Sequence, residues 1–360
     1  MNNTKNILVI DWLDAYGGAE RVAKYLDEIF KFDEVYTLAN VMTDKNIHLM
    51  FSKKNIKIKT SFLQFLGNKF RYALPLFPIA IKSLNIKHKN ALIISVSHSV
   101  SKGIPYDPSS KHISYLVARN LKYIWEEKPL YFLGIRKLFL FIIPYLKSFD
   151  INSSTKPDKI ISTSKFVSNW AKHKYNIDTQ VVYSPIDINK FTFEKNKDNY
   201  YVTVGRLEPY KRFDLLIDVF NKNGKNLIVI GDGSQKKELE LKSESNIEFK
   251  GFLETDLINE YLKKAKGFVF GGKEDFGIAL IEPQICGTPV IAYAAGGALE
   301  TVIDKKTGIL FNSQTTKSIN NAILLFENTI FDADIIRKNA LQFSIENFKS
   351  NFKRIVENDS

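Results

Sequence analysis

Two patterns of apolar and polar positions alternate along the first half of the chain: short continuous apolar runs, and apolar residues repeated at helical spacing. A continuous apolar run at residues 5–11 (KNILVID) precedes a glycine-containing loop, and residues 19–30 then repeat apolar side chains at helical spacing. Further apolar runs occur at residues 34–39, 91–97, 112–118 and 159–164. Short apolar runs separated by helices are typical of parallel strands covered on both faces, so this half predicts a doubly wound α/β domain.

The same alternation restarts after residues 181–191 (VVYSPIDINKF), where Pro185 interrupts regular structure and predicts a linker. We therefore expect two Rossmann-like domains, residues 1–180 and 181–342, that face each other across a cleft. In such sheets ligands lie beyond the carboxyl ends of the strands. A last amphipathic helix, residues 343–360, is expected to pack back on the first domain.

Composition adds limits to this picture. The 360 residues, 44% of them hydrophobic, suffice for two cores, and the lone Cys286 excludes a disulfide framework and is expected in the core. The longest apolar stretch, residues 138–146, is too short to span a bilayer, and no cleavable signal is visible. These features predict a soluble cytoplasmic protein.

The excess positive charge lies entirely in the first half of the chain. Residues 1–180 hold 27 Lys and Arg against 14 Asp and Glu, whereas residues 181–360 hold 24 against 25. Residues 46–106 contain no acid, and their lysines are interleaved with large apolar side chains. An anionic membrane surface attracts such a segment by about 1 kcal/mol per cation, so we expect a peripheral position on the inner face of the plasma membrane. A merely solvated basic face is the alternative, and nucleic acid is not expected.

Residues 271–297 (GGKEDFGIALIEPQICGTPVIAYAAGG) place Glu274 and Glu282 eight positions apart. If the whole interval were helical, the acids would be about 12 Å apart along the axis, too far to contact one small group. We therefore expect the helix to begin near Phe276 and Gly277. The amides of Phe276, Gly277 and Ile278 would then have no intrahelical acceptor and could bind phosphate.

The two acids suit hydroxyls rather than phosphate, because like charges repel and carboxylates accept hydrogen bonds from sugars. An anion-binding helix start between two hydroxyl acceptors fits a nucleotide sugar. Arg206 and Lys211, in the segment VGRLEPYKRFD, follow the first strand of the second domain and could bind the diphosphate. Gly17 and Gly18 precede a helix in the first domain, where the backbone can approach a ligand.

These motifs resemble those of a known family. The segments GGAE, GRLEPYKR and KEDFGIALIEPQICGTPVIA are similar to the retaining, nucleotide-sugar-dependent family 4 glycosyltransferases of the GT-B fold, especially bacterial mannosyltransferase-like members. The resemblance extends over nearly the whole chain. It departs from the family at residues 117–125 (VARNLKYIW), where related sequences often carry a His-Thr-Pro-like run, so acceptor recognition transfers less well than donor recognition.

The resemblance implies a role for each matching residue. Glu274 would position the donor sugar, Glu282 would hold the ribose, and His98 would lie near the donor sugar. The donor-binding residues implied are Gly17, Gly18, Arg206, Lys211, Glu274, Asp275, Phe276, Gly277, Ile278 and Glu282. The catalytic residues implied are Glu274, Arg206, Lys211 and His98.

The sequence thus predicts a metal-independent hexosyltransferase without a cofactor. It would move a hexose to a hydroxyl of a glycan or lipid-linked oligosaccharide in bacterial cell-surface polysaccharide synthesis, and the resemblance alone implies mannose from GDP-mannose as the first expectation. The acids Asp332 and Asp334 could suggest a metal site, but they stand where a helix begins, and Asp is a good N-cap. A nucleotide-sugar epimerase on the same fold and a non-catalytic binder of anionic surfaces are the alternatives.

Overall fold

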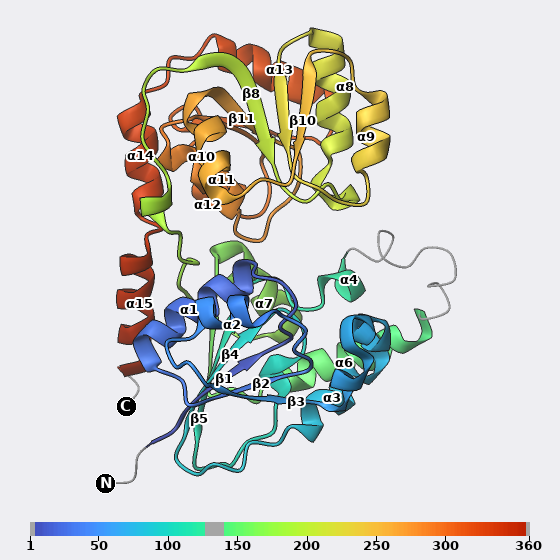
Figure 1. The fold of residues 1–360 in the computed structure, drawn as a ribbon, viewed down its shortest axis with the longest axis vertical. Coiled ribbons are helices and arrows are strands. Elements are labelled where there is room, and N and C mark those ends of the chain that lie inside the picture. The colour runs from blue at the N-terminus through green and yellow to red at the C-terminus, as the bar shows by residue number, and fades with distance from the viewer. Residues whose placement is uncertain (1–3, 127–139, 358–360) are drawn as a thin grey trace. The chain divides into compact units, whose positions relative to one another are not determined.

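The computed structural model describes residues 4–126 and 140–357, which form two compact units, each with its own sheet (Figure 1). The first unit comprises Met1–Pro185 and Phe348–Ser360, and the second comprises Ile186–Asn347. The chain therefore changes unit at Pro185 rather than at residue 180. It returns at Phe348 rather than at Phe343, whose ring packs edge-on against Phe276 in the second unit, with centroids 5.5 Å apart.

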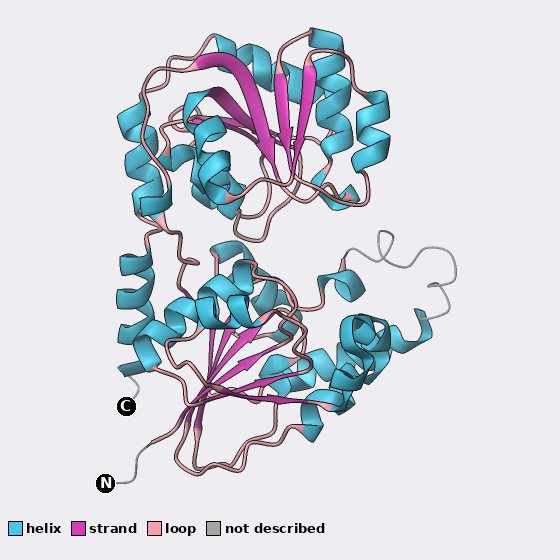
Figure 2. Cartoon of the chain, viewed as in Figure 1, coloured by secondary structure: helices cyan, strands magenta, loops and turns pink. Residues whose placement is uncertain are grey.

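The first unit contains a seven-stranded parallel sheet in the order β3-β2-β1-β4-β5-β6-β7. Figure 2 shows strands in magenta and helices in cyan. The strands of this sheet are β1 (Asn6–Ile10), β2 (Glu34–Thr37), β3 (Lys57–Thr60), β4 (Leu92–Ser97), β5 (Lys111–Leu116), β6 (Lys159–Ser162) and β7 (Gln180–Val181). The apolar runs predict all of these except β3 and β7. The strand β3 alternates lysine with other residues, and β7 has only two residues. Strand order reverses between β1 and β4.

Helices cover this sheet, and the core lies between them and the strands. They are α1 (Gly18–Phe30), α2 (Asp44–Met50), α3 (Phe77–Ser83), α4 (Lys122–Trp125), α6 (Ile143–Ser154), α7 (Lys165–Tyr175) and most of α15 (Ile345–Glu357), with the 3-10 segments η1 (Phe62–Leu76) and η2 (Ser101–Gly103). Ile7 and Val9 of β1 pack with Ile93 of β4 and with Phe77 and Ile81 of α3.

The second unit repeats this architecture with six parallel strands in the order β10-β9-β8-β11-β12-β13. The strands are β8 (Asp198–Val204), β9 (Leu227–Ile230), β10 (Ile247–Gly251), β11 (Ala265–Phe270), β12 (Val290–Tyr293) and β13 (Gly308–Phe311). The helices are α8 (Phe213–Asn223), α9 (Lys236–Lys242), α10 (Thr255–Lys264), α11 (Ile278–Ile285), α12 (Ala298–Thr301), α13 (Thr316–Glu327) and α14 (Ala333–Leu341), with η4 (Ile188–Lys190) and η5 (Pro209–Lys211). Here the strand order reverses between β8 and β11.

The predicted fold class, two Rossmann-like α/β domains with parallel sheets, is confirmed. Cys286 is fully buried, as predicted. Asp332 caps α14 by accepting hydrogen bonds from the amides of Asp334 and Ile335, at 2.8 and 3.3 Å.

Within residues 4–126 and 140–357, every helix falls short of the length and apolarity needed to cross a membrane. The first two residues of the apolar stretch 138–146 lie outside the described ranges, and its end enters α6.

Candidate functional site

The loops that follow β8 and β11 meet where the strand order of the second sheet reverses. Lys211, the last residue of η5, donates from Nζ to Oε1 of Glu274, which lies in the loop after β11. Both side chains are largely buried, at 13% and 22% exposed. The Lys211 ammonium also lies 5.1 Å from the ring centroid of Phe270, the last residue of β11. The predicted phosphate-binding cation and sugar-binding acid are therefore neighbours at the reversal point, where sheets of this kind bind ligands.

A second loop contact fixes the segment that carries both predicted cations. Glu208 accepts hydrogen bonds from the amide and hydroxyl of Ser234, at 3.2 and 2.7 Å, which ties this segment to the loop after β9. Arg206 lies just beyond β8 and is exposed, and its Nη2 donates to the Tyr210 hydroxyl at 3.3 Å. Arg206 thus lies on the same loop as Lys211, with its guanidinium accessible to an anion.

The helix after this loop begins at Ile278, one residue beyond the predicted start near Phe276 and Gly277. Gly277 is the N-cap of α11, with φ 95° and ψ 51°, in the left-handed region that favours glycine, and Ile278 is the first helical residue. The first helical hydrogen bond joins the Leu280 amide to the Gly277 carbonyl at 2.9 Å. The amides of Ile278, which was predicted, and of Ala279, which was not, therefore have no intrahelical acceptor and could bind an anion.

The side chains around this helix start divide into buried and accessible ones. The Phe276 ring is buried against Phe343, so Phe276 can offer a ligand only its backbone. Asp275 is also buried. Glu282 is half-buried in the second turn of α11, as expected from its spacing.

Two glycines that sequence reasoning missed hold the Glu274 loop in place. The Gly297 amide donates to the Glu274 carbonyl at 2.8 Å, and a Cβ on Gly297 would lie 2.0 Å from the Phe276 carbonyl oxygen. A Cβ on Gly296 would lie 2.1 Å from the Glu274 carbonyl oxygen. The signal was available, because this Gly-Gly pair follows β12 at the same edge of the sheet.

At the corresponding reversal point of the first sheet, an aspartate organises the loop after β4. Asp11 directly follows β1 and is fully buried. Its carboxylate accepts hydrogen bonds from the amides of His98 and Ser99 at 2.7 and 2.8 Å, and from those of Val100 and Ser101 at 2.7 Å each. Sequence reasoning missed Asp11, although an acid at the end of the apolar run ILVID was a usable signal.

The predicted His98 is the first residue of this loop. Its Nδ1 lies 3.1 Å from Oδ2 of Asp11, and its ring packs edge-on against Trp12 with centroids 4.5 Å apart. Burial lowers the pKa of His98, and the Asp11 carboxylate opposes that shift without reversing it. The imidazole is therefore neutral at pH 7.

The predicted glycines of the first unit form the start of α1. Gly17 is the N-cap, and Gly18, the first helical residue, is exposed. The Gly17 amide donates to Oε2 of Glu20 at 2.9 Å, and burial raises the pKa of Glu20 to about 7. Glu20 therefore lies in the first turn of α1, at the end of the helix that was expected to approach the ligand. The sequence analysis named this residue only as part of the segment GGAE.

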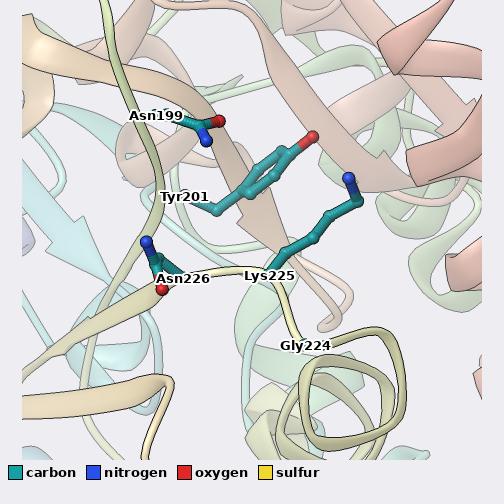
Figure 3. A pocket seen from close by; sticks show the side chains of 5 residues that line it. All are labelled: Asn199, Tyr201, Gly224, Lys225 and Asn226. Carbon is teal, nitrogen blue, oxygen red and sulfur yellow. The ribbon is translucent and has the colours of Figure 1, made fainter.

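A hollow of about 180 Å³ opens at the amino ends of β8 and β9, on the edge opposite the Lys211–Glu274 pair (Figure 3). Lys225 and Tyr201 line it, and both contact Glu327: Lys225 at 3.1 Å and the Tyr201 hydroxyl at 2.5 Å. The Lys225 charge is thus already compensated. The hollow therefore offers a diphosphate less free positive charge than the site at the strand-order reversal, where Arg206 is exposed.

Possible metal ligands do not cluster in the part of the chain that the structure describes: no group of three His, Cys, Asp or Glu side chains there is placed to hold an ion.

Comparison with known families adds an independent finding for the second unit. Residues 186–342 match the family described as Glycosyl transferases group 1. The match spans β8 to α14 and so includes Arg206, Lys211, Glu274 and Glu282.

Curated relatives are similar over about half of the chain. An uncharacterized glycosyltransferase of Methanocaldococcus jannaschii is 29% identical over 197 residues, 53% of this chain and 56% of the relative. An alpha-1,3/1,6-mannosyltransferase of Dictyostelium discoideum is 27% identical over 245 residues, 57% of this chain and 56% of the relative. The chain thus covers little more than half the length of either relative.

Solved structures resemble the chain over nearly its full length. Anabaena HepE, crystallised in complex with UDP, has a TM-score of 0.70 at 18% identity, covering 98% of this chain and 100% of its own. The lipopolysaccharide outer core galactosyltransferase WaaB, in its apo form, has a TM-score of 0.70 at 16% identity, covering 99% and 100%. At these identities the likeness establishes the fold.

Proposed function

We propose, from the match of residues 186–342 to the glycosyl transferases group 1 family, that this chain is a retaining hexosyltransferase that uses a nucleoside diphosphate sugar. The acceptor would be a hydroxyl of a glycan or lipid-linked oligosaccharide in cell-surface polysaccharide synthesis. Mannose from GDP-mannose is the first donor to test, and the mannosyltransferase of Dictyostelium discoideum supports it. The UDP complex of Anabaena HepE makes UDP-sugars the second.

The contact between Lys211 and Glu274 carries this proposal. A cation suited to phosphate and an acid suited to sugar hydroxyls lie together where the strand order reverses. The start of α11, with the amides of Ile278 and Ala279, closely follows Glu274 in the chain. A diphosphate bound at these amides would attract Lys211, and the sugar hydroxyls would take its place as hydrogen-bond donors to Glu274.

Reaction at this site requires stabilisation of a leaving group. When the bond between the anomeric carbon and the diphosphate oxygen breaks, negative charge develops on the diphosphate. Arg206, Lys211 and the α11 amides would stabilise that charge, and preorganised donors of this kind typically contribute about 3–4 kcal/mol each. Glu274 would orient the sugar, and a phosphate oxygen would accept the proton of the attacking hydroxyl. No metal ion is needed in this scheme.

The first unit would hold the acceptor, with His98 near the transferred sugar and the backbone at Gly17 and Gly18 against the phosphate. The neutral imidazole of His98 can donate a hydrogen bond to a sugar hydroxyl or accept one from it. Asp11, by fixing the loop after β4, would position that imidazole.

Donor identity can be tested by thermal unfolding in the presence of GDP-, UDP- and ADP-sugars. A ligand at 100 times its Kd stabilises the protein by about 2.7 kcal/mol, so the correct donor should raise the melting temperature measurably. Product analysis then separates the possible reactions: release of nucleoside diphosphate that requires an acceptor supports transfer, whereas an isomerised sugar formed from donor alone supports an epimerase.

Residue roles can be tested with Arg206→Ala and Lys211→Ala against Lys222→Ala. Lys222 is an exposed lysine in the last turn of α8, outside the site. At saturating donor we expect kcat to fall roughly 100- to 1,000-fold in the first two variants and to be unchanged in the third. Near-full turnover in both site variants would refute the assignment.

A further inference from the structure

A hollow of about 170 Å³ on the first unit combines two cations with hydroxyl and amide donors. Its lining residues belong to α3, to α6 and to the turn that follows α6. Both helices are labelled in Figure 1. The residues that line it are Lys82, Tyr145, Ser148, Phe149, Asn152, Ser153 and Lys156. Lys82 and Lys156 are both exposed, and neither forms an ion pair with a described residue. The hollow therefore has the composition of an anion site with its charge uncompensated.

Large apolar side chains that are exposed to solvent lie on the two helices that line this hollow and on the segments next to them. Tyr145 lines the hollow itself and is 47% exposed, and Phe141, one helical turn before it, is 79% exposed. Ile79 of α3, three residues from Lys82 and so on the same side of the helix, is 52% exposed. Other exposed apolar residues of α6 and η1 are Phe62, Phe65, Tyr72, Leu76 and Ile151.

Acids are nearly absent from the elements that form this surface. The segments η1 and α3 contain none, and α6 contains only Asp150. Asp150 is fully buried and binds Lys102, Trp125 and Tyr175 within the unit. The elements η1, α3 and α6 therefore expose basic and apolar side chains and no acid of their own, and Asp14 of another segment pairs with Arg71 of η1. Such a composition suits a lipid surface that is negatively charged at its headgroups and apolar beneath them.

We propose that this hollow binds the phosphate headgroup of an anionic phospholipid. Lys82 and Lys156 would contact the phosphate, and Ser148 and Asn152 would donate hydrogen bonds to it. Ile79, Phe141 and Tyr145 would enter the boundary between headgroups and acyl chains. The proposal rests on the expected attraction of the first half of the chain to an anionic membrane surface, which would bring the enzyme to the lipid-linked acceptor of the proposed function, and it assigns that surface a binding site.

Vesicle co-sedimentation without donor or acceptor tests this independently of catalysis. We expect the full chain to bind vesicles containing phosphatidylglycerol and to bind pure phosphatidylcholine vesicles at least tenfold more weakly. The double variant Lys82→Ala/Lys156→Ala should lower the partition coefficient on anionic vesicles by roughly 10- to 30-fold, about 1 kcal/mol per cation. Its turnover with a water-soluble acceptor should be unchanged.

The matched control is Lys54→Ala/Lys57→Ala, which removes two exposed lysines of the same acid-free segment outside the hollow. We expect this control to weaken binding less than threefold. Equal weakening by the two double variants would show that diffuse charge alone binds the vesicle and would overturn the proposal. Equal binding of the unmodified chain to neutral and anionic vesicles would also overturn it.

A second pair of variants tests the apolar border. Ile79→Ser and Phe141→Ser should each weaken binding to anionic vesicles severalfold, because each removes apolar surface that would leave water. Both side chains are exposed, so the fold should tolerate the changes. Unaltered binding in both variants would contradict insertion at this surface. Loss of vesicle binding with intact donor turnover, or the reverse, separates this proposal from the proposed function.

Discussion

Asp11 illustrates how one buried side chain can determine the shape of a distant loop. Its two carboxylate oxygens accept four backbone hydrogen bonds from residues 87 to 90 positions away. A buried carboxylate is costly unless it is well hydrogen-bonded, and here the amides of a turn compensate it. These hydrogen bonds fix the backbone of His98 next to Asp11 and so determine where its side chain begins.

Replacement of this carboxylate should therefore loosen the loop. Asp11→Asn keeps the shape of the side chain but exchanges one acceptor oxygen for an NH2 group, which leaves two buried amides facing a donor. We expect the free energy of unfolding of the first unit to fall by about 2–3 kcal/mol, measured by urea denaturation. Asp14→Asn is the control, because Asp14 forms a partly exposed ion pair with Arg71 of η1, and its loss should cost less than about 1 kcal/mol. Equal midpoints for Asp11→Asn and the unmodified protein would contradict this role.

Glu20 should make the stability of the first unit depend on pH. Burial raises its pKa to about 7 from the usual 4.5, assisted by the nearby Asp14 and opposed by the hydrogen bonds from the backbone and by Arg71. Because the folded state holds the proton more tightly than the unfolded state, this stabilisation is complete below pH 4.5. It is lost as the pH rises to 7.

Glu20→Gln removes this titration while it keeps an acceptor for the Gly17 amide. The difference in unfolding free energy between the unmodified protein and Glu20→Gln should therefore change by roughly 3 kcal/mol between pH 4.5 and 7.5, in favour of Glu20→Gln at the higher pH. Chemical denaturation at several pH values across this range would measure it. A constant difference across the range would show that folding does not raise the pKa of Glu20.

At the scale of secondary structure elements, the sequence predicts what is local. Apolar runs identified the buried strands, and the spacing of Glu274 and Glu282 placed the start of α11 within two residues. The error arose because Gly277 adopts a left-handed conformation that excludes it from the helix. The edge strand β3 was not predicted, because lysines occupy alternate positions in it and it forms no continuous apolar run.

Contacts between loops could not be predicted in the same way. The hydrogen bond from Gly297 to Glu274 and the carboxylate of Asp11 both depend on which strands are neighbours. That order comes from packing of the whole sheet and leaves no local mark in the sequence. For this reason the motifs of the candidate site were recognisable in the sequence. Gly297 and Asp11 left a signal as residues at the ends of strands, but the loops that they contact could not be predicted.

The loop after β12 gives a prediction about this positioning. In Gly297→Ala the new Cβ would lie 2.0 Å from the Phe276 carbonyl oxygen, so the Glu274 loop must move. We expect the Kd for the donor nucleotide, measured by calorimetry, to rise at least tenfold. Gly224→Ala is the control: Gly224 has φ 67°, and a Cβ there would have no atom within 4 Å, so that variant should lose stability but keep nucleotide affinity. Unchanged affinity in Gly297→Ala would show that the Gly297 contact does not position the site.

At the scale of the whole molecule, each unit has its own core. The last helix, α15, brings the end of the chain back to the first unit. The second unit ends at Asn347, within the first turn of α15, and the rest of α15 belongs to the first unit. Phe348 and Phe352 of this helix pack against Tyr115 of β5, and Lys349 pairs with Glu28 of α1. The stability of the first unit therefore depends on residues synthesised after the entire second unit.

Two phenylalanines nine residues apart should consequently affect different units. Phe352 is fully buried, with its ring centroid 5.7 Å from that of Tyr115 and 6.0 Å from that of Phe30, so Phe352→Ala should destabilise the first unit by about 3–5 kcal/mol. Phe343→Ala should destabilise the second unit instead, because Phe343 packs against Phe276. Hydrogen–deuterium exchange with mass spectrometry can locate each effect: protection should fall in β1, β4 and β5 for Phe352→Ala and in β8, β11 and β12 for Phe343→Ala. If both variants lowered protection equally in both sheets, the two cores would unfold as one cooperative unit, and the division of the chain at Pro185 and Phe348 would have no energetic meaning.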